Sequence, residues 1–440
     1  MAMPSRSEGL VVENGSIWYV HPYAGGPGVG TYDRPFHLVR EWRESGINAS
    51  VIAPAFHHLM YQDAVGIGHR IIAGVPYFFA YAPRYSGNGI GRMVNMIGFA
   101  AALVLQCRMA ARHCGRPDVV IASSPHPFSV LSAFVLQRLY GCKIVFEIRD
   151  LWPLSIIELT NKGPNNFFVR VVGAVERLAC HNADHVVSLL ENTFPYLETR
   201  GLTSDRFAWV PNGVSLAPLQ PPVRGGEVQA LVSKWKQEGR LVVVYAGTIG
   251  LANNLDALLN TARVARDAQE ERLRFLIVGE GPRRTHVQNR IVQEDLNNVT
   301  VVGRIPKEEL QALLPNCDVG YLSLHDSPLF RFGVSPNKLF DYMAASLPVL
   351  FAINSPGNPI ERYQAGICVA PNDVEATFGA LRRLIGLSPG ERRSMGAAGR
   401  SAVVKHFAYP ALAARYLEIL RPLLAAKAGS RVTGSEATSQ

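Results

Sequence analysis

Short apolar runs alternate with helix-like segments along almost all of this 440-residue chain. The segments between the runs, such as 34–44 and 128–139, repeat apolar residues at helical spacing. The first half contains five apolar runs, at residues 16–22, 49–55, 118–124, 143–149 and 184–190. Runs of strand length separated by helices predict a parallel, doubly wound sheet.

The second half repeats this pattern after a turn-rich stretch at 211–226, which we interpret as a linker. Its apolar runs lie at 241–247, 273–279, 298–303, 318–324, 347–352 and 366–370. Two such sheets predict a two-domain α/β protein whose ligands bind beyond the carboxyl ends of the strands. We expect the following parts: a first domain at 15–211, a second at 212–408, a helix at 409–426 and a structureless tail at 427–440.

Composition and charge narrow the function classes. With 48% hydrophobic and 18% charged residues the chain is globular. A net charge of +9 suits nucleic acid, phosphorylated ligands or an anionic lipid surface. Nucleic acid is disfavoured because no basic run with interleaved aromatic residues and no zinc module is present. The apolar stretch 93–105 is too short to span a bilayer, and it predicts either a buried helix or peripheral membrane contact.

The six cysteines show neither close pairing nor metal-site spacing, so we expect buried thiols and no metal. The first residues lack the apolar core of a signal peptide. These features predict a cytoplasmic protein, and they leave contact with the inner face of the cytoplasmic membrane open.

The segment SPNKLFDYMAASLPV, residues 335–349, combines a turn, a helix start, an acid and a strand start. Ser335 is a good N-cap for a helix beginning near Pro336. The first N–H groups of that helix and the ammonium of Lys338 would attract a diphosphate. Asp341 can accept hydrogen bonds from both hydroxyls of a ribose. An ordinary capped helix with a solvated lysine and acid explains the same residues.

A glycine-rich loop, AGGPGVG at residues 24–30, follows the first strand. Glycines such as Gly26 and Gly28 allow backbone N–H groups to approach a phosphate or a sugar closely. A tight structural turn is the equally good alternative.

Charged residues follow two other strands of the first half. Glu147, Arg149 and Asp150 stand together at the end of an apolar run, where concentrated charge is typical of a site. Asp150 could orient or deprotonate an acceptor hydroxyl, whereas an ion pair that caps the strand is the alternative. His126 follows the preceding strand at the same edge of the sheet and could bind an acceptor, although a lone histidine is more often structural.

The 335–349 segment resembles the end of the signature helix in retaining glycosyltransferases of the GT-B family often called family 4. There an acid, seven residues and a second acid precede small residues and a strand. Asp341 matches the second acid, which holds the ribose in that family, but Gly333 stands where the first acid should be. The pattern, together with RDLWP at 149–153, is similar to a subgroup that transfers N-acetylated deoxysugars such as L-fucosamine.

The resemblance extends to the loop YAGTIGLANN, which aligns with the turn that binds the diphosphate in the family. Thr248 takes the place of an arginine there, and Asn253 takes the place of a lysine. Both positive charges are missing from this loop. Lys338, Arg331, Arg283 or a helix N-terminus beginning at Asn253 would have to replace them.

The loops VGEGP and VGRIP resemble those that shape the base pocket, where backbone near Arg304 and Ile305 would read uracil. Catalytic roles are implied for Asp150, Arg149 and His126. Donor-binding roles are implied for a larger set: Gly26, Gly28, Gly247, Thr248, Asn253, Gly279, Gly281, Arg304, Ile305, Arg331, Ser335, Asn337, Lys338 and Asp341.

Three functions follow from these patterns. The resemblance implies a retaining transferase with two Rossmann-like domains facing each other across a cleft. It would use a UDP-sugar donor, no metal, and a sugar or polyprenyl-diphosphate-linked acceptor of bacterial surface-polysaccharide synthesis. The missing charges favour a catalytically weak nucleotide-sugar-binding partner protein instead. A sugar-nucleotide epimerase of the same architecture is the third alternative.

Overall fold

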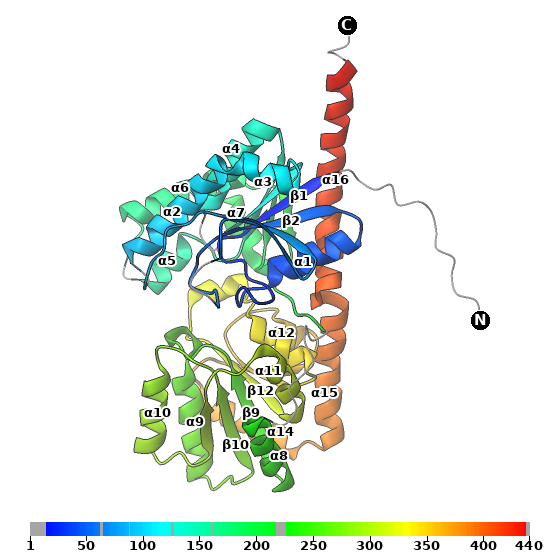
Figure 1. Cartoon of the computed structure of the whole chain (residues 1–440). Coiled ribbons are helices and arrows are strands. Elements are labelled where there is room, and N and C mark those ends of the chain that lie inside the picture. Colours follow the sequence, from blue (N-terminus) through cyan, green and yellow to red (C-terminus); the bar gives the residue numbers. More distant parts are fainter. Residues whose placement is uncertain are drawn as a thin grey trace, which may run out of the picture. The chain divides into compact units, whose positions relative to one another are not determined.

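The computed structural model describes residues 15–61, 65–87, 89–124, 127–160, 162–216 and 226–436. Contacts divide the chain into two compact units, each with its own sheet (Figure 1). Unit 1 holds the described chain up to Leu189, then Phe194–Val210 and the chain from Leu412. Unit 2 holds Leu190–Thr193 and Pro211–Ala411. The short segment Leu190–Thr193 was expected in the first domain and belongs to unit 2.

Unit 1 is built on an eight-stranded sheet with the order β3-β4-β2-β1-β5-β6-β7-β8. All neighbouring strands run parallel except β3 and β4. The strands are β1 (Ser16–Val20), β2 (Asn48–Pro54), β3 (Gly68–Ile72), β4 (Val75–Ala80), β5 (Val119–Ser124), β6 (Lys143–Ile148), β7 (His185–Ser188) and β8 (Phe207–Trp209). The five predicted strands are confirmed as β1, β2, β5, β6 and β7, whereas β3, β4 and β8 were not predicted.

Helices connect these strands and cover the sheet. They are α1 (Arg34–Glu44), α2 (Ile90–Leu105), α3 (Cys107–Cys114), α4 (Phe128–Tyr140), α5 (Leu154–Leu159), α6 (Phe167–Asn182) and α7 (Phe194–Glu198). In α1 a proline stands in the first turn, and Phe36, Leu38, Val39 and Trp42 repeat at helical spacing and are buried. The proline and the apolar spacing therefore account for where α1 begins and for which side of it is buried.

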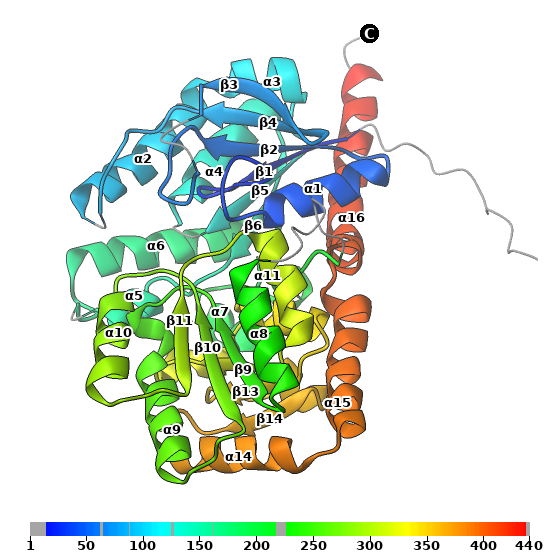
Figure 2. The ribbon, with the colours of Figure 1, turned by 60° about the horizontal axis from the view of Figure 1, so that its bottom comes forward.

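Unit 2 contains a fully parallel six-stranded sheet with the order β11-β10-β9-β12-β13-β14 (Figure 2). All six predicted strands are confirmed: β9 (Leu241–Ala246), β10 (Leu273–Val278), β11 (Val299–Val302), β12 (Val319–Ser323), β13 (Val349–Ala352) and β14 (Gly366–Val369). The helices are α8 (Glu227–Gln237), α9 (Leu255–Asp267), α10 (Arg284–Gln293), α11 (Lys307–Leu313), α12 (Asn337–Ala344), α13 (Pro359–Arg362), α14 (Val374–Gly386) and α15 (Pro389–Ala402). A core formed by β9, β10, β12, α9 and α14 fixes this sheet.

The last helix, α16 (Tyr409–Glu436), belongs to unit 1 from Leu412 onward. Trp42 of α1 donates a hydrogen bond from Nε1 to the carbonyl of Ala413 at 3.2 Å. The backbone stays helical to Glu436, so the expected structureless tail from residue 427 was wrong as far as Glu436. The remaining four residues of that tail lie outside the described range.

All six cysteines are free thiols, and five are buried as expected. Cys368 on β14 is exposed instead. No single described helix is long and apolar enough to cross a membrane. The pair α2 and α3 reaches that length and composition only together, and the two helices are bent by 65° relative to each other.

Candidate functional site

Glycines allow the chain to pass closely at the carboxyl ends of β9 and β10 in unit 2. Gly247 follows β9 and donates its N–H to the carbonyl of Val278 at 2.9 Å. A Cβ atom on Gly279 would lie 1.9 Å from the carbonyl oxygen of Gly247, and one on Gly281 would lie 2.4 Å from that of Ile249. Gly279 and Gly281 are therefore required by the contact between two loops. Their part in donor binding stays a prediction.

Lys338, in the first turn of α12, reaches the end of β9. Its Nζ atom donates hydrogen bonds to the hydroxyl of Tyr245 at 3.0 Å and to Oδ1 of Asn253 at 2.6 Å. The ammonium also lies 4.4 Å from the centre of the Tyr245 ring. Among the described residues it forms no ion pair with a carboxylate. Burial lowers the pKa of Lys338 to about 7.

Thr248 and Asn253, which stand where the family has an arginine and a lysine, take part in holding Lys338 in place. Asn253 donates from Nδ2 to the carbonyl oxygen of Thr248 at 3.0 Å, which turns its Oδ1 toward Lys338. The hydroxyl of Tyr245 donates to the same carbonyl at 2.6 Å. The structure thus brings Thr248, Asn253 and Lys338 together, as the resemblance implied. The positive charge comes from α12 instead of from the loop after β9.

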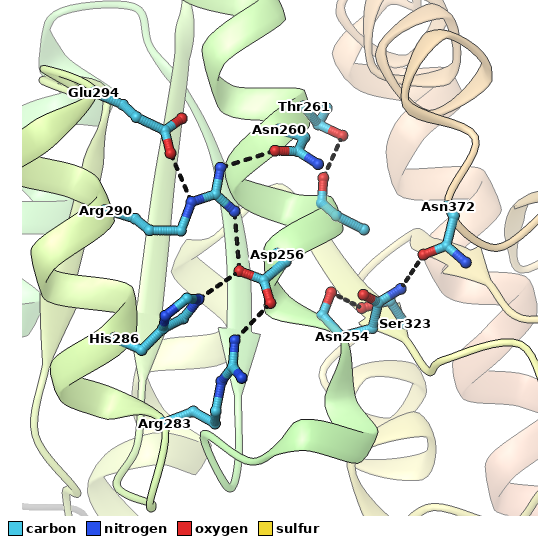
Figure 3. Close-up of polar contacts among 11 residues, drawn as sticks. Asn254, Asp256, Asn260, Thr261, Arg283, His286, Arg290, Glu294, Ser323 and Asn372 are labelled. Carbon is cyan, nitrogen blue, oxygen red and sulfur yellow. Dashed lines mark hydrogen bonds and ion pairs between the residues drawn. The ribbon is translucent and has the colours of Figure 1, made fainter.

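Arg283 forms an ion pair with an acid, and its part in replacing the missing charge stays a prediction. Its Nη2 atom donates to Oδ2 of Asp256 at 2.9 Å, and Arg290 and His286 contact the other oxygen at 2.9 and 2.8 Å (Figure 3). Burial would raise the pKa of the Asp256 carboxyl, but hydrogen bonds from His286 and Arg290 lower it overall. The carboxylate therefore stays charged, and Arg283 shares it with Arg290 and His286.

Arg331 is also engaged locally. It is exposed, donates from Nη1 to the carbonyl of Pro328 at 3.1 Å, and lies over the Phe332 ring at 4.5 Å. No hydrogen bond joins it to Lys338 or Asn253. Its part in donor binding stays a prediction.

The start of α12 differs from the expectation. The helix begins at Asn337, and the N-cap position is Pro336, which offers no capping side chain. Ser335 has another partner, because its Oγ accepts the backbone N–H of Asn212 at 2.8 Å. The amide of Asn212 also donates to the carbonyl of Ser335 at 2.6 Å. The predicted cap was therefore wrong, and sequence reasoning missed Asn212, which it had assigned to the linker.

The backbone conformation disfavours an acid at position 333. Gly333 has a φ of 99°, a conformation that L-residues rarely adopt. A Cβ atom there would also lie 3.3 Å from the backbone nitrogen of Glu191. A glutamate at this position would require the chain to move.

Asp341 lies in the second turn of α12 and is half-buried. It lines a hollow with Glu308 and Gln311 of α11, Ala345 and Arg400. The residues expected at the base pocket come directly before α11, with Arg304 exposed and Ile305 half-buried. Lys338, Arg304 and Ile305 do not line this hollow. Ribose binding by Asp341 stays a prediction.

In unit 1, Arg149 is held by two aromatic rings beyond the end of β6. Its guanidinium lies 3.9 Å from the centre of the Tyr32 ring, and its Nη1 lies 2.9 Å from Nε2 of His21. The His21 and Tyr32 rings stack at 4.6 Å, and the N–H of Tyr23 donates to Nδ1 of His21 at 3.0 Å. Asp150, the next residue, is exposed. Sequence reasoning missed His21 and Tyr32.

Glu147 belongs to the core and not to a site. Its carboxylate accepts hydrogen bonds from the hydroxyls of Tyr19 and Tyr416 at 2.7 Å and of Ser123 at 2.8 Å, and it pairs with Arg34 at 3.2 Å. Burial would raise the pKa of Glu147, but Arg34 and the three hydroxyls lower it overall. The expectation of Glu147 at a site edge was therefore wrong.

The glycine-rich loop folds back on itself. Gly26 donates its N–H to the carbonyl of Gly30 at 3.2 Å, and a Cβ atom on Gly26 would lie 2.9 Å from the Tyr77 hydroxyl. Gly28 is exposed at the tip, with a φ of 72°. The alternative of a tight structural turn thus accounts for Gly26. Donor contact by Gly26 or Gly28 stays a prediction. His126 lies outside the described residues.

The comparisons decide the family. A model described as Glycosyltransferase Family 4 matches residues 34–217, and one described as Glycosyl transferases group 1 matches residues 240–386. The chain is a family 4 glycosyltransferase of the GT-B fold. WcaI of Escherichia coli (strain K12), named as a colanic acid biosynthesis glycosyl transferase, is 24% identical over 312 residues, covering 69% of this chain and 74% of WcaI. WbjE of Pseudomonas aeruginosa, named as a glycosyltransferase, is 23% identical, covering 78% of this chain and 82% of WbjE.

Solved structures confirm the fold of this transferase. Sucrose-phosphate synthase from Thermosynechococcus elongatus superposes with a TM-score of 0.71 at 17% identity, covering 94% of this chain and all of that one. WaaG, a glycosyltransferase of lipopolysaccharide biosynthesis, gives 0.63 at 15% identity, covering 92% and 99%. HepE of Anabaena, solved with UDP-glucose, gives 0.60 at 12% identity with the same coverage. The predicted GT-B fold class is confirmed.

Proposed function

We propose that this transferase moves a sugar, with retention of configuration, from a UDP-sugar to a sugar or lipid-linked sugar acceptor. The observation that carries the proposal is the lysine at the end of β9. Lys338 forms no ion pair with a carboxylate among the described residues, and its two hydrogen bonds go to uncharged oxygens, of Tyr245 and Asn253. An ammonium placed in this way favours an anionic ligand.

The position of Lys338 suits the diphosphate of the donor. It lies at the carboxyl end of the central strand β9, beside Gly247, which has no side chain to block an approaching ligand. The backbone N–H groups that open α12 add partial positive charge. When the sugar leaves, negative charge develops on the diphosphate, and a fixed ammonium stabilises that charge.

For the acceptor side we propose Asp150 and Arg149. The rings of Tyr32 and His21 fix the Arg149 guanidinium, and the neighbouring Asp150 is exposed. An exposed carboxylate beside a fixed guanidinium can orient an acceptor hydroxyl and take up its proton. Asp341 and the backbone at Arg304 and Ile305 are proposed to hold the ribose and the base.

The sugar and the pathway are proposed from the relatives. WcaI carries a name from colanic acid biosynthesis, and HepE was solved with UDP-glucose. These names support a UDP-type donor and a role in bacterial surface-polysaccharide synthesis, and we propose that the chain works at the inner face of the cytoplasmic membrane. We propose an N-acetylated hexosamine or deoxysugar as the transferred group, because the PNKLFDYMAAS and RDLWP patterns resemble the L-fucosamine subgroup.

The test is transfer from a panel of UDP-sugars to a polyprenyl-diphosphate-linked sugar, with the anomeric configuration of the product read by NMR. Lys338→Met should weaken UDP binding about 10- to 100-fold, the range expected for losing one charge-assisted contact. Asp341→Ala should weaken UDP binding similarly. Lys234→Met and Asp267→Ala change exposed residues of the same unit and serve as matched controls. Unchanged UDP binding in both site variants would contradict the donor site.

A second candidate function is supported by Gly333. Because its backbone conformation leaves no room for the first acid, the chain could bind a nucleotide-sugar without transferring it. UDP-sugar binding without transfer or hydrolysis over the whole panel would favour this partner-protein function over the transferase.

A further inference from the structure

The helix α2 is apolar on its outer side as well as on its inner side. On its inner side it buries Met96, Phe99 and Leu103, and Met96 packs in a cluster with Phe128 of α4 and Val169 of α6. The opposite side exposes Ile90 (81%), Val94 (49%), Ile97 (51%) and Leu105 (83%). These residues, with exposed Ala101, follow one another at intervals of three and four, so they form one stripe along the helix. The sequence expectation of a buried helix thus holds for one side only.

The neighbouring helix α4 widens this stripe. The Oγ of Ser132 on α4 donates to the carbonyl of Ala100 on α2 at 2.8 Å, which joins the two helices side by side (Figures 1 and 2). α4 also exposes three apolar side chains at helical spacing: Leu131, Val135 and Leu139. We call Ile90, Val94, Ile97 and Leu105 with these three residues the outer apolar face. Exposed apolar side chains gathered on two neighbouring helices are typical of an interaction surface.

Arginines lie at one end of the outer apolar face. Arg108, Arg112 and Arg116 follow α2, Arg138 stands in the last turn of α4, and all four are exposed. Arg108 and Arg116 both act on Tyr140 at the end of α4, so this end carries positive charge from two segments. An apolar face with a basic margin is typical of a surface that lies in the headgroup region of a bilayer.

Acids are nearly absent from this part of the chain. Residues 64–146 contain eight Arg and Lys residues and a single acid, Asp118. Asp118 is buried and accepts the backbone N–H of Ser16 at 2.9 Å, so it does not reach the surface. The segment that carries α2, α3 and α4 therefore presents mainly positive charge, which suits an anionic partner.

We infer that the outer apolar face docks unit 1 on an anionic lipid bilayer, with the apolar side chains below the headgroups and the arginines among the phosphates. A second copy of the chain fits less well, because a symmetric dimer would bring like arginines toward each other. This inference deepens the membrane part of the proposed function, on which it rests. Its failure would leave transfer to a soluble acceptor unaffected.

The test measures sedimentation of the full chain with vesicles of phosphatidylcholine, with or without about one-third phosphatidylglycerol. The chain should bind the anionic vesicles and lose most of that binding at high salt. Ile90→Asp with Leu105→Asp should reduce the bound fraction about tenfold or more. Val292→Asp is the matched control, because Val292 on α10 is equally exposed (80%) and apolar but lies in unit 2.

The charge is tested separately by Arg108→Glu with Arg138→Glu, which should also abolish binding. Arg383→Glu with Arg393→Glu is the charge-matched control, since both arginines are exposed on unit 2. Every substituted side chain is exposed, so the variants should fold, and an unchanged melting temperature verifies this. The inference is overturned if the wild-type chain binds neither vesicle or if the aspartate variant binds normally. A wild-type dimer that the aspartate variant converts to monomer would overturn it too.

Discussion

At the scale of single residues, one lysine determines how we interpret the proposed donor site. The loop after β9 carries the uncharged residues Thr248 and Asn253 where the family has an arginine and a lysine. Their polar atoms instead position Lys338, which arrives from α12. The positive charge at the end of β9 is therefore supplied by a residue of α12.

The pKa of Lys338 leads to a pH dependence of donor binding. Without a ligand its pKa is about 7, and a bound diphosphate would raise it by opposite charge. Donor binding therefore takes up a proton above pH 7, so donor affinity should fall as the pH rises from 7 to 9. Calorimetric titration with UDP across this range measures the effect. Lys338→Arg, which stays charged at all these pH values, should flatten the profile. An equally steep profile in that variant would assign the titration to another group.

Gly333 gives a second prediction. Gly333→Ala should destabilise unit 2 by about 1–3 kcal/mol, because alanine is strained at a φ of 99°. Thermal unfolding followed by circular dichroism measures the change. Gly379→Ala is the control of opposite sign, since this glycine lies inside α14 with open space around it, and alanine favours a helix interior. Equal melting temperatures for the two variants would contradict the backbone argument.

Some site residues could be predicted from sequence and others could not. Lys338 was predicted because helix starts and charges are local patterns. Asn212 and Tyr245 were missed because their roles depend on partners about a hundred residues away, Ser335 and Lys338. Glu147 was misassigned since a charged residue after a strand looks the same in sequence whether its partners are substrate or buried tyrosines.

At the scale of elements, the Glu147 cluster ties together four parts of unit 1. Tyr19 of β1, Arg34 of α1, Ser123 of β5 and Tyr416 of α16 all contact its carboxylate. Every lone pair of this buried charge has a donor, which is the condition under which a buried ion pair does not destabilise.

Removing the charge should therefore be costly. Glu147→Gln leaves the buried Arg34 without its carboxylate and should reduce the free energy of unfolding by about 3–5 kcal/mol. Tyr416→Phe removes one hydroxyl donor and should cost about 1–3 kcal/mol. Urea unfolding measures both. Tyr81→Phe is the matched control, because Tyr81 is half exposed, and a loss for Tyr416→Phe no greater than for this control would refute the cluster's role.

The strands that sequence reasoning missed have separate physical causes. β3 and β4 form a hairpin whose turn uses Ala73 and Gly74, both at positive φ. Alanine is not a residue that signals such a turn. β8 has only three residues, all half-buried, so it offers no apolar run. Most parallel strands were predictable because burial on both faces makes them apolar throughout, although β4, which is parallel to β2 and almost fully buried, was overlooked.

At the scale of the whole molecule, the chain enters unit 1, forms unit 2 and returns to unit 1 at Leu412. A chain ending at Ala411 lacks Tyr416 and the Ala413 carbonyl, which pair with Glu147 and Trp42. We expect hydrogen exchange to increase throughout β1, α1 and β6 in this truncated chain. Exchange in the β9, β10 and β12 strands should stay unchanged, because their core lies within unit 2. Uniform loss of protection in both units would contradict this division.

Cys368 can be used to label the chain at a defined position. It is the exposed one of six free thiols, and the other five are buried. A maleimide fluorophore should therefore attach to the unmodified chain at a single place on the edge strand β14. Partial burial raises the pKa of this thiol, so labelling would proceed best at mildly alkaline pH. The native sequence thus carries its own attachment point for fluorescence titrations of nucleotide binding, without engineered cysteines.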